Sequence, residues 1–443
     1  MSAAKPSLYE ILTIESNDKE RTADLRLGTV SVDYYEDIFS PTITAKIRVI
    51  NTGDSIAPKD DPIGPRQSIY HGLPLRGGER VVLKIKDRGV GKVGIDFSKE
   101  PSDYLYVSSI TDVISDTQRE SFTLHLVSRE AITNETTRVV KKYPTTLPIN
   151  ESVKKILNDV LKTEKYDKSS IEKSQNKYGF LGNLRKPFTI LVWLASKAVP
   201  VSSGDATAGF VFYQTQDGFN FKSIDQLISQ KPKAEYVHSE VNESQIESNT
   251  RNNDFQITSY TTDKNQDLIE KLRLGTYASQ RMFFDPLTFQ FKTQVFQLDG
   301  YKEKIENLGN EVDLPPLNET SDKTLGETPT RILSSVIDRG TMEKEVSKDE
   351  NADPSKYQAQ AIMRYNVLFT QTVRMTVPCN TNLRAGDVIK CFFPKISRGD
   401  SSEFDRDQSG LYMIKELCHH FETDGSFTSM LLVRDTFGLY TGK

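Results

Sequence analysis

The strongest constraint on the fold is a run of short alternating segments in residues 372–434. Val373, Met375 and Val377 alternate with polar residues, so one face of this segment is apolar and the other is polar. Turn residues separate the segments, and an Asp-Gly pair at 424–425 predicts a hairpin between two of them. Short strands at this spacing are typical of a small antiparallel barrel or sandwich. Such an element builds interfaces more often than it houses a reaction.

A second strand-rich region covers residues 20–127 and contains few helix candidates. Ile43 and Ile47 fall on the same face of an alternating segment, as expected for a half-buried strand. We expect at least five strands here, forming a first β-barrel-like domain. The Gly-acid turn at residues 77–79 resembles the turn at 385–387, and each precedes a strand that begins with valine. This likeness is a hint that the two barrels are related.

The middle of the chain, residues 128–235, predicts an α+β unit. Apolar residues recur at helical spacing over Asn150–Leu161, and Pro187 begins a second apolar helix. Gly209–Tyr213 and Phe219–Phe221 flank an Asp-Gly turn, which predicts a hairpin. We expect this unit to contribute to a second barrel. Shorter helices are predicted at 128–135 and 223–228.

The rest of the chain predicts a mixed connecting region with a polar arm. Residues 305–360 are mostly charged and polar and contain four prolines, which is typical of a long arm or a poorly packed excursion. The predicted fold class is therefore mainly β with α+β: two small antiparallel β-barrel-like domains, helix-containing domains and a long arm. The expected divisions are a first β-barrel domain at 20–127, an α+β domain contributing to a second barrel at 128–235, a mixed connecting domain with the polar arm at 236–365, and C-terminal strands completing the second barrel at 366–440.

Composition excludes several classes of protein. The 443 residues allow about three domains, and 57 basic against 61 acidic residues leave no basic stripe for nucleic-acid binding. The longest apolar stretches fall far short of the roughly 20 residues of a membrane span, and the N-terminus lacks the pattern of a secretion signal. Cys379, Cys391 and Cys418 are expected to be buried thiols rather than disulfides, which predicts a reducing cytoplasm.

No metal or cofactor site is predicted. His419 and His420 are adjacent in a strand segment, so their side chains point to opposite faces and cannot easily share a metal ion. Gly89–Gly94 resembles a phosphate loop, but neither a Ser or Thr nor a helix follows its lysine, so a connection between strands is expected. The acids Asp60 and Asp61 are expected to be solvated turn residues. The remaining histidines, which have no nucleophile or acid in a recognised arrangement, are His71, His125 and His238.

Four groups of segments occur in an order and spacing that resemble one known family. They include the hairpin Asp217-Gly218-Phe219-Asn220-Phe221 and the run Leu383-Arg384-Ala385-Gly386-Asp387-Val388-Ile389. No single motif is diagnostic, and the resemblance lies in the order of all four groups. The complete set is 121–128, then 152–161, then 186–188 with 209–213 and 217–221, then 383–389 with 409–414 and 430–435.

The chain resembles the central hub subunit of the baseplate of contractile-tailed, T-even-like phages. The likeness runs with gaps from residue 20 to 435, and residues 240–365 match poorly. The resemblance implies a homotrimer in which each subunit contributes two similar barrels, giving a torus with pseudo-sixfold symmetry. It implies a membrane-piercing spike on one side, the first ring of the tail tube on the other, and DNA passing through the lumen. It also implies a structural virion protein of the tail baseplate, assembled in the host cytoplasm, without a cofactor or a reaction of its own.

Two other functions remain open at this point. A tail-associated peptidoglycan hydrolase would need two carboxylates at a defined separation. The nearest candidates, which solvated loop charge explains better, are Asp400, Glu403, Asp405 and Asp407. A carbohydrate or host-receptor binding module would expose aromatic side chains, whereas Trp193, the only tryptophan, falls in an apolar helix.

Overall fold

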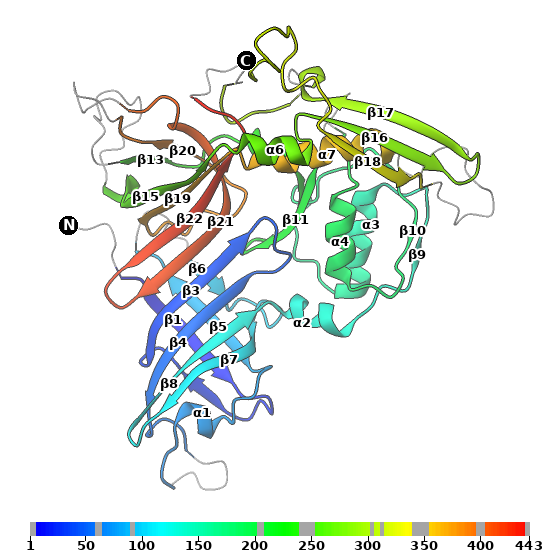
Figure 1. Cartoon of the computed structure of the whole chain (residues 1–443). Coiled ribbons are helices and arrows are strands. Elements are labelled where there is room, and N and C mark those ends of the chain that lie inside the picture. The colour runs from blue at the N-terminus through cyan, green and yellow to red at the C-terminus, as the bar shows by residue number, and fades with distance from the viewer. Residues whose placement is uncertain are drawn as a thin grey trace.

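Strands dominate the chain, and its helices pack beside them (Figure 1). This arrangement confirms the predicted fold class of a mainly β protein with α+β parts. The structure is a computed structural model that describes residues 6–57, 64–88, 94–201, 208–238, 253–301, 305–310, 314–338, 354–395 and 404–438. Within these ranges one sheet contains 15 strands, and three smaller sheets accompany it.

The N-terminal strands form a curled sheet around their own apolar core, which we call module 1 (lower half of Figure 1). In β4, Ala45, Ile47 and Val49 are buried while Lys46 and Arg48 between them are exposed, which confirms the predicted alternation. The strand order is β3-β4-β8-β7-β5-β1-β2, with β6 beside β5. The elements are β1 Leu8–Glu15, β2 Thr22–Asp24, β3 Thr29–Asp37, β4 Thr44–Thr52, α1 Ile69–Gly72, β5 Arg80–Lys86, β6 Ile95–Phe97, β7 Leu105–Ser115 and β8 Arg119–Val127.

A second curled sheet, module 2, gathers strands from the last half of the chain around a separate core. Its order is β14-β13-β20-β21-β22-β19-β15, and Asp424 and Gly425 lie in the predicted turn between β21 and β22. Neither module closes into a barrel among the described strands. The strands are β13 Glu235–His238, β14 Gln256–Ile257, β15 Ser259–Asn265, β19 Gln371–Pro378, β20 Val388–Phe392, β21 Gly410–Glu422 and β22 Ser426–Arg434.

An α+β unit connects the two modules along the chain. The predicted helices and hairpin are confirmed, and Pro187 begins α4 because its fixed φ suits the first helical position. Ser223 caps α5 by accepting a hydrogen bond from the backbone N–H of Gln226. The elements are α2 Arg129–Thr136, β9 Lys142–Tyr143, α3 Ile149–Ile156, a π-helical turn Leu157–Leu161, β10 Phe180–Leu181, α4 Pro187–Ala195, β11 Phe210–Thr215, β12 Gly218–Ser223 and α5 Ile224–Ile228.

A three-stranded sheet of order β17-β16-β18 lies above this unit (Figure 1). One of its faces packs on α7, where Phe296 contributes to a small core with Met363. The opposite face leaves apolar side chains such as Phe291 and Val336 exposed. The elements are the 3₁₀ turn Asn253–Phe255, α6 Leu268–Leu274, β16 Ala278–Asp285, β17 Gln290–Gln297, the 3₁₀ turn Leu298–Gly300, β18 Arg331–Val336 and α7 Pro354–Leu368. None of the helices in the described ranges is long and apolar enough to cross a membrane.

The polar arm predicted for residues 305–360 is correct only in part. Ile305 is buried in the small core that contains Phe296 and Met363, and Leu308 is buried in a separate core. These two apolar side chains therefore anchor part of the stretch to the rest of the molecule. Strand β18 also belongs to this stretch and pairs in parallel with β16. Residues 314–330 are mostly partly or fully exposed and fit the expectation, whereas 339–353 lie outside the described residues.

The turn before β20 requires a glycine at position 386, and this requirement can be tested. Its φ is +90°, and a Cβ atom at this position would lie 2.6 Å from the hydroxyl oxygen of Tyr213. We therefore expect Gly386→Ala to lower the free energy of unfolding by about 1–3 kcal/mol, since strain and steric conflict act together. Thermal melting monitored by circular dichroism would show the loss. Gly53→Ala is the matched control, because a Cβ there meets nothing within 4 Å, and equal melting of the two variants would contradict the expectation.

Candidate functional site

Strand β21 belongs to both modules and joins them into one sheet. Its first residues, Gly410–Met413, pair with β20 of module 2. Its last residues, Glu416–Glu422, pair with β3 of module 1 over seven registered positions. On its opposite edge, β21 pairs with β22 over residues Met413 to Phe421 of β21. The two curled sheets are therefore continuous through backbone hydrogen bonding rather than merely packed side by side.

The continuous sheet contains an eight-stranded strip that we call the shared strip. Its order is β7-β8-β4-β3-β21-β22-β19-β15. Each of the seven neighbouring pairs in this order is antiparallel. Module 1 supplies the first four strands and module 2 supplies the last four. The strip is thus one continuous surface to which both modules contribute four strands each.

One face of the shared strip carries the two apolar cores, and the other face is open and polar. One cross-strand row on the open face follows the register from Thr44 through Tyr35 and Cys418 to Ser429 and Thr376. Charges on this face are mixed: they include the basic side chains Lys46, Arg48 and Arg374 and the acidic side chains Asp33, Asp37, Glu416 and Glu422. A hollow of about 700 Å³ lies on this face where β3, β4, β19, β21 and β22 meet.

A buried carboxylate lies at the point where module 1, module 2 and the α+β unit meet. Glu36 on β3 accepts hydrogen bonds from the Tyr34 hydroxyl at 2.8 Å, from the backbone N–H of Gln216 at 2.7 Å and from the backbone N–H of Ala385 at 2.9 Å. Burial raises the pKa of Glu36, although Arg384 and the three donors act in the opposite direction. One side chain therefore links all three parts of the molecule.

Further polar contacts surround this carboxylate, and they are buried except at the exposed carboxylate of Asp217. Arg384 of module 2 donates to Asp217 in the β11–β12 turn at 2.9 Å and to the carbonyl oxygen of Thr381 at 2.6 Å. The Thr381 hydroxyl donates in turn to buried Asp87 of module 1 at 2.7 Å, and the Gly94 N–H donates to the same hydroxyl at 3.0 Å. Such a network fixes relative orientation, because any displacement leaves a buried polar group unpaired.

The two adjacent histidines point to opposite faces of β21, as the sequence predicts. His419 is fully buried against Tyr34, and desolvation lowers its pKa to about 3, so it is neutral. His420 lies on the open face between Asp33 and Glu422, and its Nε2 is 2.8 Å from the Glu422 carboxylate. The hydrogen bond to Asp33 is the main reason that the pKa of His420 rises to about 9. His420 and Asp33 thus form an ion pair across the junction of the modules.

The strip ends at two partly unpaired edges. Among the described residues, β15 pairs on one side only, with β19. At the other end, β5 pairs with β7 only at Leu105 and Tyr106. The backbone of Val107 also bonds to Gly78 and Glu79, and no strand pairs with the outer edge of β7 beyond it within the described ranges.

No family model matches the sequence, and no curated protein matches it. The fold is similar to that of the tail protein from Neisseria meningitidis MC58, with a TM-score of 0.50 and 11% identity over 96% of each chain. It is also similar to the 43 kDa tail protein of prophage MuSo2 from Shewanella oneidensis, with a TM-score of 0.52 and 8% identity over 96% of this chain and 98% of that one. Both are tail proteins. At these identities the likeness establishes the fold.

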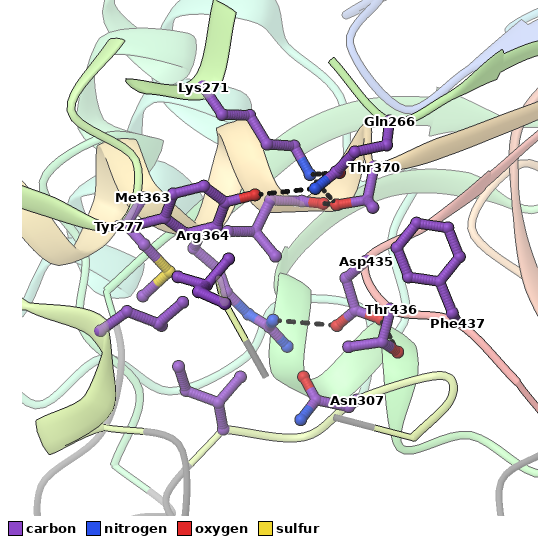
Figure 2. A pocket seen from close by; sticks show the side chains of 14 residues that line it. Gln266, Lys271, Tyr277, Asn307, Met363, Arg364, Thr370, Asp435, Thr436 and Phe437 are labelled. Atoms are coloured by element: carbon purple, nitrogen blue, oxygen red, sulfur yellow. Dashed lines mark hydrogen bonds and ion pairs between the residues drawn. The ribbon is translucent and has the colours of Figure 1, made fainter. Parts of the chain in front are cut away.

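Figure 2 shows a pocket between α6, α7 and the C-terminal segment, where a small-molecule site would be sought. Lys271 Nζ donates to Gln266 Oε1 at 2.8 Å and also to the Thr370 hydroxyl. Arg364 pairs with Asp435 at 3.2 Å. Among the described residues that line the pocket, Asp435 is the only carboxylate, and there is no histidine or cysteine. Lys271 is thus held by neutral partners and Arg364 by Asp435, and these charged groups form neither a carboxylate pair nor a nucleophile with its base.

The structure places the other predicted candidates apart from any common site. Asp405 accepts hydrogen bonds from the backbone N–H groups of Asp407 and Gln408, so it stabilises a local turn. Trp193 is partly buried and packs on Tyr178 and Phe180 of the α+β core. Residues that lie outside the described ranges are Asp60, Asp61, Asp400, Glu403 and Gly89–Val93.

Glu36 is the structural residue that sequence reasoning missed. The sequence could have indicated this role, because Val32, Tyr34 and Glu36 occupy every second position of β3 and so share its buried face. A carboxylate in phase with core residues must find buried partners. The alternation can be read from the sequence, but the backbone donors cannot be identified from it, because they lie about 180 and 350 residues away.

Replacement of Glu36 by glutamine tests the junction. Glu36→Gln puts an amide nitrogen opposite one of the backbone N–H donors, so we expect a loss of about 1–3 kcal/mol in the free energy of unfolding. Asp37→Asn is the matched control on the next residue of β3, which lies on the partly exposed face. Denaturant titration would compare the two. A smaller loss for Glu36→Gln than for Asp37→Asn would refute the assigned role.

The His420 ion pair predicts a pH dependence of stability. The pKa of His420 is about 9 in the folded state and about 6.5 in the unfolded state. The ion pair therefore contributes fully to the free energy of unfolding below pH 6.5, and this contribution is lost as the pH rises through 9. We expect His420→Gln to melt below the unmodified protein at pH 6 and the gap to close at pH 10. Melting curves across this range would measure the gap, and a gap that is constant or grows with pH would count against the pair.

Proposed function

We propose that the chain is the central hub subunit of a contractile phage tail baseplate. In this proposal three copies form a ring that joins the tail tube on one side to the membrane-piercing spike on the other. The protein acts in the tail baseplate of the virion after assembly in the host cytoplasm, and it catalyses no reaction. The fold that it shares with two tail proteins supports the tail assignment.

The observation that carries the proposal is the shared strip. Two modules of the same chain contribute four strands each to one antiparallel sheet, with their cores on one face and polar side chains on the other. This arrangement suits a wall segment whose open polar face borders an aqueous space and whose bulky face supports neighbours. Two quasi-equivalent modules in each of three copies would supply six similar wall units.

The charges of the open face are compatible with passage of DNA. Lys46 and Arg374 are accompanied by acids on the same face, among them Asp33, Asp37 and Glu416. A wall with a continuous row of cations would bind the phosphate backbone and release counterions, which would retain the polymer. A mixed wall gives little such binding, as a channel for DNA requires.

A peptidoglycan hydrolase remains the alternative, but no geometric feature favours it. Of its four candidate acids, the two within the described residues lie in one turn, where Asp405 is occupied by backbone donors. A peptidoglycan zymogram tests this alternative, since a zone of clearing by the purified chain would replace the structural proposal with an enzymatic one.

Native mass spectrometry of the purified chain tests the ring. We expect a species of three subunits, about three times the 50.1 kDa chain mass, and negative-stain images with a central opening. Closed cyclic symmetry is the usual outcome when one chain carries complementary surfaces. A strict monomer over a wide range of concentration and salt, both alone and with spike and tube proteins added, would refute the proposal.

A further inference from the structure

The three-stranded sheet β17-β16-β18 has one covered face and one open face (upper right of Figure 1). Helix α7 packs on the covered face, where Phe296 meets Met363. By their register, the charged residues of the three strands all lie on the α7 side, and they are Arg281, Asp285, Lys292 and Arg331. The open face carries six apolar and three neutral polar residues, in the cross-strand rows Val295-Gln280-Ile332, Thr293-Met282-Ser334 and Phe291-Phe284-Val336.

We infer that this open face is the docking site for one amphipathic α-helix of another protein of the tail. The inference rests on the proposed function for the source of the helix, and it names a partner surface outside the shared strip. The partner helix presents an uncharged apolar stripe, because a charged side chain set against this face would lose its water without gaining a partner.

The apolar residues of the open face are exposed together rather than singly. Ile332 is 62% exposed, Val336 is 64% exposed and Phe291 is 74% exposed. Single exposed apolar residues are normal on a protein surface and need no explanation. Apolar residues gathered on one exposed face mark a site of interaction with another molecule.

The strand pairing indicates that the cover of this face is a helix. Strands β16 and β18 pair in parallel over six positions, and parallel pairing is typical of sheets whose two faces are both covered by helices. Here α7 covers one face, and the exposed side chains show that no described element covers the other. Residues 339–353, which follow β18 in the chain, lack an apolar stripe, because eight of the fifteen are charged and only Met342 and Val346 are large and apolar.

The dimensions of the face fit one helix and exclude a second copy of the chain. Three strands about 4.8 Å apart, with six residues of about 3.3 Å each, give a face of roughly 14 Å by 20 Å. A helix about 10 Å across and roughly 14 residues long covers this area. Two copies packed face to face would bury roughly 600 Å², well below the about 1,200 Å² of a stable interface between whole proteins. A helix that other contacts hold in the same assembly needs less area, because tethering raises its effective concentration.

The turn between β16 and β17 provides a second, independent observation. Phe289 has a φ of +56°, a left-handed conformation that glycine or asparagine adopts at the least cost, and its side chain is 78% exposed. Its ring centroid lies 6.0 Å from that of Phe284, which in turn lies 5.3 Å from that of Phe291. A strained and exposed aromatic residue gains little within the subunit. Burial of its ring by a partner would offset the strain and anchor the helix at this end of the face.

Binding of a designed peptide to the purified full-length chain tests the site. The probe is a fluorescein-labelled helix of roughly 14 residues with leucines at i, i+4, i+7 and i+11 on a background of alanine, glutamate and lysine. We expect saturable binding by fluorescence anisotropy, and we expect Val336→Lys to raise the Kd roughly tenfold or more because the new ammonium group would be desolvated. Val140→Lys is the matched control, since Val140 is 65% exposed but lies in the α+β unit, and it should leave the Kd unchanged.

A peptide of the same composition with its leucines spread around the helix should bind roughly tenfold more weakly, because it has no apolar stripe. Absence of saturable binding of the striped peptide, or equal Kd values for Val336→Lys and Val140→Lys, would overturn the inference.

Replacement of Phe289 separates docking from folding. Asparagine accepts the left-handed conformation, so Phe289→Asn should melt at or above the temperature of the unmodified chain while its Kd for the peptide rises about fivefold. A lower melting temperature with an unchanged Kd would make Phe289 part of the packing of the subunit itself and would count against the inference.

Two other occupants of the face would give distinct results, and each would overturn the inference. Association of the unmodified chain that Val336→Lys abolishes in the absence of peptide would make the face a contact between copies. Binding to phosphatidylcholine vesicles that the same variant abolishes would make it a membrane contact. Because peptide binding does not require the ring, a chain that binds the peptide but never forms a trimer would remove the proposed ring and leave a helix-docking site, whereas a trimer that does not bind the peptide would do the reverse.

Discussion

The architecture depends on the pairing of β21 with β3. Seven registered positions, from Glu416 opposite Asp37 to Glu422 opposite Ser31, turn two curled sheets into one. Because a shift of one residue would move every side chain to the other face, this register also decides that His420 faces outward and His419 inward. The continuity of the open polar face and the position of both cores on the opposite face depend on this ladder.

Backbone pairing alone would leave the modules free to twist against each other, and the buried polar junction removes this freedom. Glu36 receives donors from the α+β unit and from module 2, while Arg384 reaches back to Asp217. Buried charges of this kind contribute little net stability compared with well-packed apolar residues, but a wrong orientation leaves them unpaired. We therefore interpret the junction as a set of contacts that selects one arrangement of the three parts.

Much of the local structure could be predicted from the sequence, because alternation and turn residues act over a few positions. The buried face of β4, the hairpin of β11 and β12 and the helix beginning at Pro187 are all examples. The long-range partners could not be predicted in this way. Nothing near Ser31–Asp37 indicates that its partner strand lies almost 400 residues later, and Leu308 lies in a polar stretch yet fills a core assembled from other segments. Periodicity reports which face is apolar, whereas the choice of partner depends on the whole chain.

The distance in sequence between β3 and β21 has a consequence for biosynthesis. All of module 1 leaves the ribosome before the last strands are translated, so the edge of β3 that later receives β21 must wait without its partner. Contacts of such long separation are slow to form, and an edge left open during translation invites pairing with another nascent chain. Slow completion of one ladder at the end of synthesis would thus set the pace of folding. The yield of correctly folded subunits should depend on how quickly the C-terminal hairpin reaches that waiting edge.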